Sequence, residues 1–425
     1  MNDRKFNKIL VLGVILFFIG SSIISSTGGT SVERHSMQDN KTPFKGLKTR
    51  GNILYVGGDG PGNYSKIQDA INDASNGDTV FVFDDSSPYY ENLIIDKSIN
   101  LSGENSISTV IDGVGNLRTI DVTADWVNIS GFTIEKSGNY WPTGIGIRSS
   151  YNTIKGNIIS NSGSGIIVGD NYNIITDNTL IKNRDGICLT EDSAYNSVTE
   201  NNIVSNSGGI YLKYSSNNNI RANNVISSGG IRIVYFSNNN TITSNIISNN
   251  RDGISIWYSC NYNTITDNLI CRNNEWGIYF GDSCNILIAD NIISWNKKGG
   301  IIFTNTSNIN IMGNIITSNN LNGVYLSSVY TNNTLSGNII SNHRVGIYLL
   351  ESVNNTISRN NLLDNKLNAF SDNSKNTWKR NYWNRPRFLP KLIFGIRRIE
   401  TRFGIDIPLP QIDIDLRPAL KPYDI

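Results

Sequence analysis

The chain has 425 residues, of which 38% are hydrophobic, enough to form a sizeable buried core. Its 37 basic and 35 acidic residues are intermixed and leave a formal charge of +2, so the composition excludes the strongly basic footprint of a nucleic-acid-binding protein. Two histidines, and four cysteines without any Cys-x-x-Cys, leave almost no ligands for a zinc or haem site, and no cofactor is expected.

The first 30 residues have the layout of a secretory signal. Arg4, Lys5 and Lys8 precede an apolar run at residues 9–24, and a polar stretch follows. The run is slightly short for a spanning helix and no small-x-small cleavage site stands out, so an uncleaved membrane anchor is the alternative. Both alternatives place the rest of the chain outside the cytoplasm, secreted or at the cell surface. Residues 31–51 are interpreted as a linker.

Residues 52–83 are predicted to form an N-terminal cap. A strand at 53–56 and a glycine-rich turn precede a helix at 64–74, where Ile67, Ala70 and Ile71 share one stripe. Gly77 is expected to end this helix, and a second strand follows at 79–83. Less regular coils are expected from residue 94 to 134.

Two residue series repeat in one register after the cap, with gaps of 21 to 24 residues. The first is an asparagine, at Asn157, Asn178, Asn201, Asn223, Asn245, Asn268, Asn291, Asn314, Asn338, Asn360 and Asn381. The second is a glycine followed by an apolar residue, at Gly144, Gly165, Gly186, Gly209, Gly230, Gly253, Gly277, Gly300, Gly323 and Gly346. Interleaved series of this kind indicate a repeat architecture.

Each repeat reads as two or three short strands. Around Gly253, Ile254 and Ile256 alternate with polar residues, which is typical of a half-buried strand rather than of a leucine-rich repeat. Stacked coils would lie about 4.8 Å apart. Asn suits the turns because it tolerates the left-handed conformation and because stacked amides hydrogen-bond along the axis. The repeats therefore predict an all-β solenoid over residues 52–373.

The cysteines suggest one disulfide in this export-directed chain. Cys260 lies seven residues after Gly253, and Cys284 seven after Gly277. Residues in one column of adjacent coils are about 5 Å apart, within disulfide range. We therefore predict a Cys260–Cys284 bridge and leave Cys188 and Cys271 unpaired, because these two fall in different columns.

Residues 374–425 lose the repeat and hold six of the ten prolines. They are interpreted as an irregular C-terminal cap or an attachment segment. Between Lys379 and Arg402, basic residues crowd around Trp383, Phe388 and Phe394. This stretch is either a basic surface or the solvated face of the cap.

The cap and the repeats together resemble a known group. The motifs Asp59-Gly60-Pro61-Gly62, Ile67-Gln68-Asp69-Ala70-Ile71, Gly77-Asp78-Thr79-Val80, Tyr90-Glu91-Asn92 and Ile94-Ile95-Asp96-Lys97-Ser98 resemble the opening of right-handed parallel β-helix proteins of the pectin-lyase type. The Asn-x-Ile and Gly-Ile-x-Leu repeats, and Asn381-Tyr382-Trp383, are similar to the NosD-like carbohydrate-binding and sugar-hydrolase (CASH) family. The resemblance covers roughly 52–385 and implies a right-handed parallel β-helix.

The resemblance also implies two activities, copper-site maturation and action on acidic polysaccharides. This sequence does not contain the family's functional residues for either one. NosD implies a periplasmic role in copper-site maturation, but copper favours sulfur and imidazole ligands, and this chain has three Met and two His. Enzymes of this fold act on acidic polysaccharides with carboxylate pairs or with a base, often beside Ca²⁺ held by Asp clusters. Nothing in this sequence supports a calcium site.

One column offers candidate catalytic carboxylates. Asp170 and Glu191 each lie five residues after a series glycine on adjacent coils, and Asp192 follows Glu191. Such carboxylates would stand about 5 Å apart, near the separation in retaining glycosidases. Solvated turn acids are the competing interpretation. A lyase, hydrolase or epimerase acting on an acidic glycan stays open as an alternative.

An outward aromatic wall is the preferred site. Tyrosines recur two residues after the series glycines, and other rings and a cation lie beside them. The predicted carbohydrate-binding residues are Tyr211, Arg232, Trp257, Tyr258, Tyr279, Tyr325 and Tyr348. Rings can stack on sugar faces while cations and amides bind hydroxyl or carboxylate groups. We expect a monomer that binds a surface or extracellular polysaccharide. The alternative is a structural or adhesive protein in which these rings only stabilise neighbouring coils.

Overall fold

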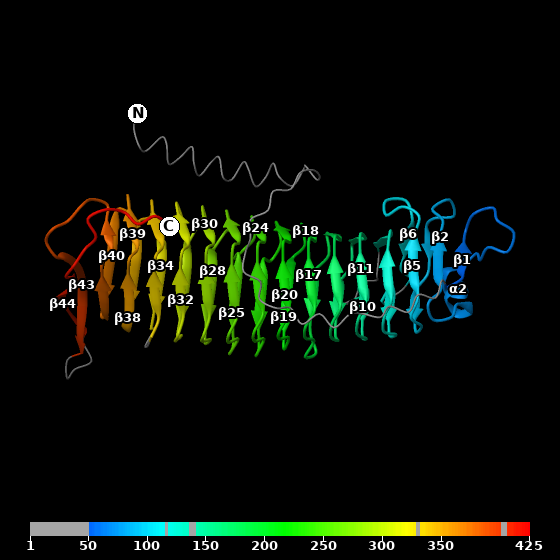
Figure 1. Ribbon diagram of the computed structural model, residues 1–425, viewed down its shortest axis with the longest axis horizontal. Helices are drawn as coiled ribbons and strands as arrows, with labels where there is room; N and C mark the ends of the chain where they lie inside the picture. The colour runs from blue at the N-terminus through cyan, green and yellow to red at the C-terminus, as the bar shows by residue number, and fades with distance from the viewer. Residues whose placement is uncertain (1–50, 115–117, 136–141, 329–331, 401–405) are drawn as a thin grey trace, which may run out of the picture. The chain divides into compact units, whose positions relative to one another are not determined.

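The computed structural model describes residues 51–114, 118–135, 142–328, 332–400 and 406–425. Three strands recur in nearly every coil, and each pairs in parallel with its counterparts one coil before and one coil after (Figure 1). Three parallel columns result, here named sheets 1, 2 and 3 in the order in which a coil visits them. The predicted parallel β-helix is confirmed. The predicted signal at 1–30 and nearly all of the 31–51 linker lie outside the described residues.

Sheet 1 contains β4 (Leu93–Ile95), β7 (Ile120–Val122), β10 (Thr143–Ile147), β13 (Ser164–Val168), β16 (Asp185–Leu189), β19 (Gly208–Lys213), β22 (Ile231–Val234), β25 (Ile254–Trp257), β28 (Trp276–Gly281), β31 (Gly299–Thr304), β34 (Asn322–Ser327), β37 (Val345–Leu350), β40 (Leu367–Asp372) and β43 (Lys391–Glu400).

Sheet 2 contains β1 (Ile53–Val56), β2 (Thr79–Val82), β5 (Asn100–Gly103), β8 (Asn128–Ser130), β11 (Thr153–Lys155), β14 (Ile174–Thr176), β17 (Ser197–Thr199), β20 (Asn219–Arg221), β23 (Thr241–Thr243), β26 (Thr264–Thr266), β29 (Leu287–Ala289), β32 (Asn310–Met312), β35 (Thr334–Ser336), β38 (Val353–Ser358), β41 (Lys375–Lys379) and β44 (Asp406–Asp415).

Sheet 3 contains β3 (Tyr89–Tyr90), β6 (Val110–Asp112), β9 (Thr133–Glu135), β12 (Ile158–Ser160), β15 (Thr179–Ile181), β18 (Asn202–Val204), β21 (Asn224–Ile226), β24 (Ile246–Ser248), β27 (Leu269–Cys271), β30 (Ile292–Ser294), β33 (Ile315–Thr317), β36 (Ile339–Ser341), β39 (Asn361–Leu363) and β42 (Tyr382–Trp383).

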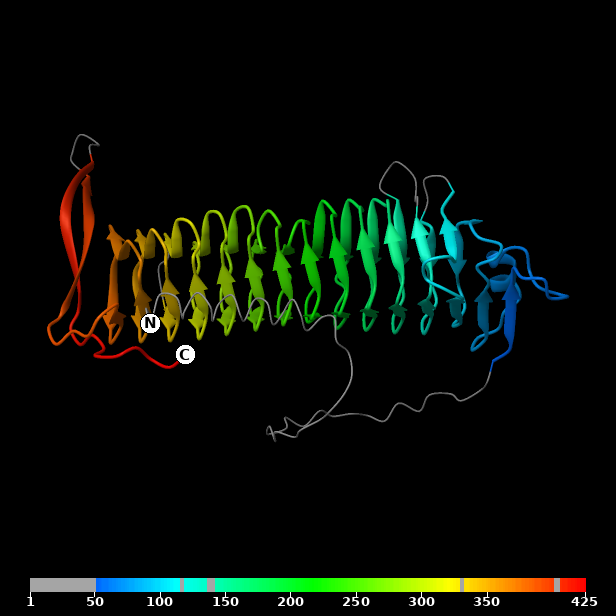
Figure 2. The ribbon, with the colours of Figure 1, turned by 90° about the horizontal axis from the view of Figure 1, so that it is seen from above.

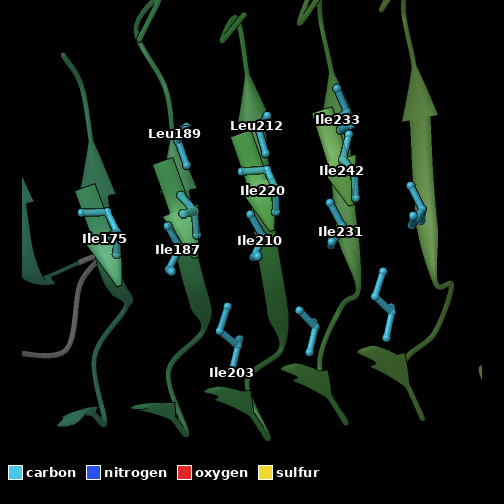
Figure 3. Close-up of a cluster of buried hydrophobic side chains, with 14 of the residues drawn as sticks. Ile175, Ile187, Leu189, Ile203, Ile210, Leu212, Ile220, Ile231, Ile233 and Ile242 are labelled. Carbon is cyan, nitrogen blue, oxygen red and sulfur yellow. The ribbon is translucent and has the colours of Figure 1, made fainter. Parts of the chain in front are cut away.

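Aliphatic side chains from all three sheets fill the interior. In one coil, Ile187 and Leu189 of sheet 1, Val198 of sheet 2 and Ile203 of sheet 3 are fully buried, and the next coils repeat the set (Figure 3). Because equivalent residues pair in register, such as Ile187 with Ile210, the columns remain in phase. Each fully buried aliphatic side chain contributes about 1.5–3 kcal/mol through removal from water.

The series glycines are required by close packing. A Cβ on Gly253 would lie 2.3 Å from the carbonyl oxygen of Gly277 and 2.4 Å from Cγ2 of Ile270. The chain therefore passes so close to the next coil that any larger residue would force the two coils apart.

The N-terminal cap holds the single helix of the described residues. Helix α2 spans Ile67–Asp73, shorter than the predicted 64–74, and buries Ile67, Ala70 and Ile71. Both carboxylate oxygens of Glu91 accept hydrogen bonds from its first backbone amides, those of Ile67 and Gln68, at 2.8 and 3.0 Å. No described helix is long and apolar enough to cross a bilayer.

The C-terminal cap is more regular than the predicted irregular segment. β43 and β44 are ten-residue antiparallel strands (Figure 2). β43 pairs with β40 of sheet 1, and β44 pairs with β41 of sheet 2, so the hairpin closes the last coil and joins two of the sheets. The proline-rich composition concealed these strands, because Pro408 and Pro410 lie within β44.

Candidate functional site

Buried polar ladders at the turns fix the position of every outward side chain. In the predicted Asn series, the backbone N–H and Nδ2 of Asn268 donate to Oδ1 of Asn291 at 3.0 Å each, and Nδ2 also reaches the carbonyl of Ile242 in the previous coil. The left-handed residue is the one before each asparagine, for example Asp267, so the conformational reason given for Asn is wrong. Asn occupies these turns because one amide satisfies several buried groups at once.

Sequence reasoning found one ladder, but the turns contain three. A second runs along the turn before sheet 2, for example from Asn218 to Asn240 to Asn263. A third runs along the turn after sheet 3, from Asn250 to Asn273 and onward. Serine replaces asparagine in some coils of the third ladder, which masks its period in the sequence.

The predicted Cys260–Cys284 bridge is not present, and both residues are free thiols. The coil beginning at Gly253 has two left-handed residues after its strand, Tyr258 and Ser259, whereas the next coil has only Asp282. This extra residue shifts the register by one. The Cys260 N–H therefore donates to Ser283, while the Cys284 N–H donates to Asn261. Counting from the series glycines could not reveal an insertion inside the turn.

The outward side chains of sheet 1 form the surface on which most of the predicted binding residues lie. In-register pairing places Tyr211, Arg232, Ser255, Tyr279, Ile302, Tyr325, Tyr348 and Phe370 in one row along the axis. We call this surface the sheet 1 face. Tyr258 lies outside it, in the turn after β25, and its ring stacks on Tyr235 with centroids 4.9 Å apart.

Two perpendicular rings stand in the middle of the sheet 1 face. Trp257 and Tyr279 have ring centroids 4.0 Å apart and an interplanar angle of 88°. In a T-shaped contact the edge of one ring meets a face of the other, and both side chains remain partly exposed. The Trp257 ring extends over Gly281, since a Cβ there would lie 3.2 Å from the indole Cζ3. Glycine at this position thus leaves room for the indole, which lies against Gly281.

Cations lie on the coils that precede these rings. The Arg232 guanidinium is 5.7 Å from the ring centroid of Tyr211, and the Lys213 ammonium is 5.6 and 5.7 Å from those of Tyr214 and Tyr235. None of the ion pairs among the described residues involves Lys213 or Arg232. Both charges remain available to an anionic group.

Stacked rings continue the row on later coils. Tyr325 and Tyr348 have centroids 5.0 Å apart, and Tyr348 and Phe370 follow at 5.6 Å. The Tyr348 hydroxyl donates to Asp372, and burial together with this carboxylate raises the pKa of Tyr348 to about 12. These rings mostly cover each other, so they stiffen the sheet 1 face more than they offer open ring faces.

Sequence reasoning missed one carboxyl group beside the central rings. Asp252 accepts a hydrogen bond from the N–H of Trp276 at 3.1 Å and lies close to Tyr279. Burial raises the pKa of Asp252, while the Trp276 N–H and the Arg251 charge oppose that rise. The Asp-Gly dipeptide at 252–253 resembled ordinary turn chemistry in the sequence, which hid its place beside the rings.

The predicted catalytic carboxylates differ in their surroundings. Asp170 accepts hydrogen bonds from the Ser150 hydroxyl at 2.9 Å and from the N–H of Asn171. Glu191 and Asp192 are exposed and both left-handed, in the turn after β16. Catalysis by these three residues stays a prediction.

A second aromatic row was also missed. Trp126, Tyr151, Tyr172 and Tyr195 lie in the turns that lead from sheet 1 to sheet 2, all with positive φ. Their centroids are 4.5, 5.1 and 5.2 Å apart, and the rings are parallel within 7°. We call this row the turn stack. Neighbouring rings cover both faces of Tyr151 and Tyr172, so these two present mainly edges and hydroxyl groups to solvent.

The His, Cys, Asp and Glu side chains are scattered in the described part of the chain. No three His, Cys, Asp or Glu side chains are grouped so that they could hold a metal ion in the described part of the chain. His343 is buried in the third ladder, where Nε2 is 3.2 Å from Asn319 Nδ2 and Nδ1 is 3.0 Å from Asn365 Oδ1. Burial lowers the pKa of His343 to about 4. A neutral imidazole with both nitrogens engaged has no lone pair left for a metal. His35 lies outside the described residues.

Two stretches of the chain match known protein families in sequence. Residues 118–270 match the family model described as right handed beta helix region, which agrees with the parallel β-helix of the structure. Residues 226–389 match the family described as periplasmic copper-binding protein (NosD), so the later coils are similar in sequence to that family. No curated protein matches the chain in sequence.

One solved structure with a TM-score above 0.5 has the same fold. The A-module of mannuronan C-5 epimerase AlgE6 from Azotobacter vinelandii aligns with a TM-score of 0.53 at 16% identity, covering 73% of this chain and 94% of that one. Polygalacturonase from Erwinia carotovora ssp. carotovora aligns with a TM-score of 0.48 at 14% identity, covering 80% and 98%. At these identities, the likeness concerns the fold alone.

Proposed function

We propose that this protein binds an extended acidic polysaccharide outside the cytoplasm, along the sheet 1 face. The observation that carries the proposal is the perpendicular Trp257–Tyr279 pair, whose two side chains are partly exposed beside two cations without carboxylate partners. Sugar rings present apolar faces that stack on aromatic rings, and uronic-acid carboxylates pair with Lys and Arg.

The fold suits such a ligand because its coils supply binding groups at a fixed interval. A chain lying along the axis would meet Lys213, Arg232, Trp257 and Tyr279 on four successive coils, about 4.8 Å apart. The solved structure with the higher of the two TM-scores is titled a mannuronan epimerase, which agrees with this ligand class. The NosD description as periplasmic agrees with a place outside the cytoplasm.

The experiment is retention in affinity gels that contain acidic or neutral polysaccharides. The unit Thr49–Ile425, which has its own core, serves as the protein. Polygalacturonate and alginate should retard it more than dextran. Lys213→Gln with Arg232→Gln should weaken retention by acidic chains about tenfold, and added salt should have the same effect.

A matched control removes two cations from other faces. Arg221→Gln with Arg272→Gln should retain the wild-type affinity, because both side chains are exposed on sheet 2 or in the turn after sheet 3. Release of reducing or unsaturated ends from the retained polysaccharide would show an enzyme rather than a binding protein. Absence of retention by every chain tested would overturn the proposal.

A further inference from the structure

The C-terminal end of the solenoid carries the most exposed apolar side chains of the described residues. Phe388 and Leu389 are 88% and 77% exposed, in the loop between β42 and β43. A soluble protein rarely leaves two adjacent large apolar residues open to water without a partner.

The same end is strongly basic. From residue 373 to residue 399 the sequence holds eight Lys and Arg residues and no Asp or Glu. Arg385, Arg387 and Lys391 flank the Phe388-Leu389 tip. Burial lowers the pKa of Lys391, and the repulsion from both arginines adds to this effect. None of these three cations forms an ion pair with a described residue; in this stretch only Arg398 does so, with Asp372.

Apolar surface continues from the tip onto the hairpin. Leu392 and Phe394 on β43 lie opposite Ile414 and Ile412 on β44, and all four are more than 40% exposed. Behind them, a cavity of about 190 Å³ is lined by Lys366 and Lys391 together with Trp383 and Phe394. Arg387 Nε is buried without a hydrogen-bond partner among the described residues. The two lysines and the unpartnered Arg387 Nε would suit an anionic oxygen. The exposed apolar side chains beside them would suit an adjacent apolar phase.

We propose that this end of the protein docks on an anionic lipid surface, with Phe388 and Leu389 entering the acyl boundary and Arg385, Arg387 and Lys391 contacting headgroup phosphates. An apolar tip between cations matches the layered chemistry of a bilayer surface, where phosphates lie directly above hydrocarbon. A second copy of the chain is the less favoured occupant, because two such ends facing each other would bring like charges together.

The test is flotation of the unit Thr49–Ile425 with vesicles of phosphatidylcholine alone or mixed with phosphatidylglycerol. This unit lacks residues 9–24, so binding cannot arise from that apolar run. We expect binding to the mixed vesicles, at least tenfold weaker binding to phosphatidylcholine alone, and little competition by inorganic phosphate. Phe388→Ser with Leu389→Ser should reduce binding at least tenfold.

Charge variants and controls separate the two contributions. Arg385→Gln with Lys391→Gln should weaken binding about 25-fold at low salt, since each surface cation contributes about fivefold. Ile107→Ser is the matched control, because Ile107 is 75% exposed in the loop between β5 and β6 near the other end of the solenoid. Circular dichroism and the thermal midpoint should stay unchanged in every variant.

Three outcomes would overturn the proposal. The first is equal binding to both kinds of vesicle. The second is unchanged binding of the Phe388→Ser/Leu389→Ser variant, which would indicate a general polyanion surface instead. The third is a concentration-dependent dimer in sedimentation equilibrium that the same variant abolishes, which would identify a second copy as the occupant.

Discussion

The buried turn ladders and the sheet 1 face differ in how their residues repeat from coil to coil. In the ladder of the Asn157 series every coil repeats the same residue, from Asn157 to Asn381, and the row ends on the buried carboxylate of Asp415. On the sheet 1 face the residue changes from coil to coil, for example from Tyr211 to Arg232 to Ser255. Uniform chemistry inside keeps the coils in register, while varied chemistry outside gives each coil a different contact group.

The difference also separates two kinds of aromatic row. The turn stack is as regular as the ladders, with parallel rings about 5 Å apart, and it contributes mainly stacking energy of about 0.5–1.5 kcal/mol per pair. The Trp257–Tyr279 pair breaks the pattern, because its rings are perpendicular and partly exposed, an arrangement that suits a ligand. Ring geometry, rather than the number of rings, distinguishes a stabilising row from a binding one.

Breaking a ladder should have the largest effect on stability. Asn268→Ala removes an amide that donates to Asn291, Ile242 and Thr266 and accepts from Asn245. Several buried groups lose their partners, so we expect the free energy of unfolding to fall by about 3–5 kcal/mol in urea denaturation. Asn320→Ala, at an exposed turn asparagine, should change it by less than about 0.5 kcal/mol. A loss below 1 kcal/mol at Asn268 would contradict the role given to the ladder.

The histidine in the third ladder should make stability depend on pH. Burial lowers the pKa of His343 to about 4, below the ordinary 6.5, so its contribution is complete above pH 6.5 and is lost as pH falls toward 4. Over that interval the wild type should lose about 3 kcal/mol relative to His343→Asn, which restores the usual ladder residue. Parallel pH profiles of the two proteins in urea denaturation would refute this.

Removing the buried charge beside the central rings should have a smaller effect. Burial raises the pKa of Asp252, so the charged carboxylate is less stable in the folded than in the unfolded protein, and Asp252→Asn should stabilise the protein near neutral pH by up to about 1 kcal/mol. The gain should shrink as pH falls through the folded pKa, because the wild-type carboxyl then becomes neutral too. Thermal unfolding at several pH values measures it, and a destabilised variant at neutral pH would show that the charge itself is needed.

Much of the fold follows from the sequence, because a solenoid converts a linear period directly into spatial neighbours. The Asn and Gly series predicted the coils, their length and the in-register row from Tyr211 to Tyr348. The period could not locate the extra residue at Tyr258–Ser259, and the predicted disulfide failed there. It also could not show that Pro408 and Pro410 lie in a strand of the C-terminal hairpin, because proline is ordinarily read as ending a strand.

The sequence predicted which residues lie on the candidate site, but it did not predict how their rings are arranged. Alternation placed Tyr279, Tyr325 and Tyr348 outward, yet nothing in the spacing distinguished the perpendicular Trp257–Tyr279 pair from the covering stack of Tyr325 and Tyr348. Asp252 was hidden for a similar reason, since its burial depends on neighbouring coils rather than on its own local sequence.

Two matched double variants test the central claim most directly. Trp257→Ala with Tyr279→Ala removes the perpendicular pair, and Tyr151→Ala with Tyr172→Ala removes two parallel rings of the turn stack. We predict that the first variant loses at least about tenfold in affinity for a retained acidic polysaccharide, measured by titration calorimetry, while the second keeps wild-type affinity. Equal losses in both, or a loss only in the turn stack variant, would contradict the account.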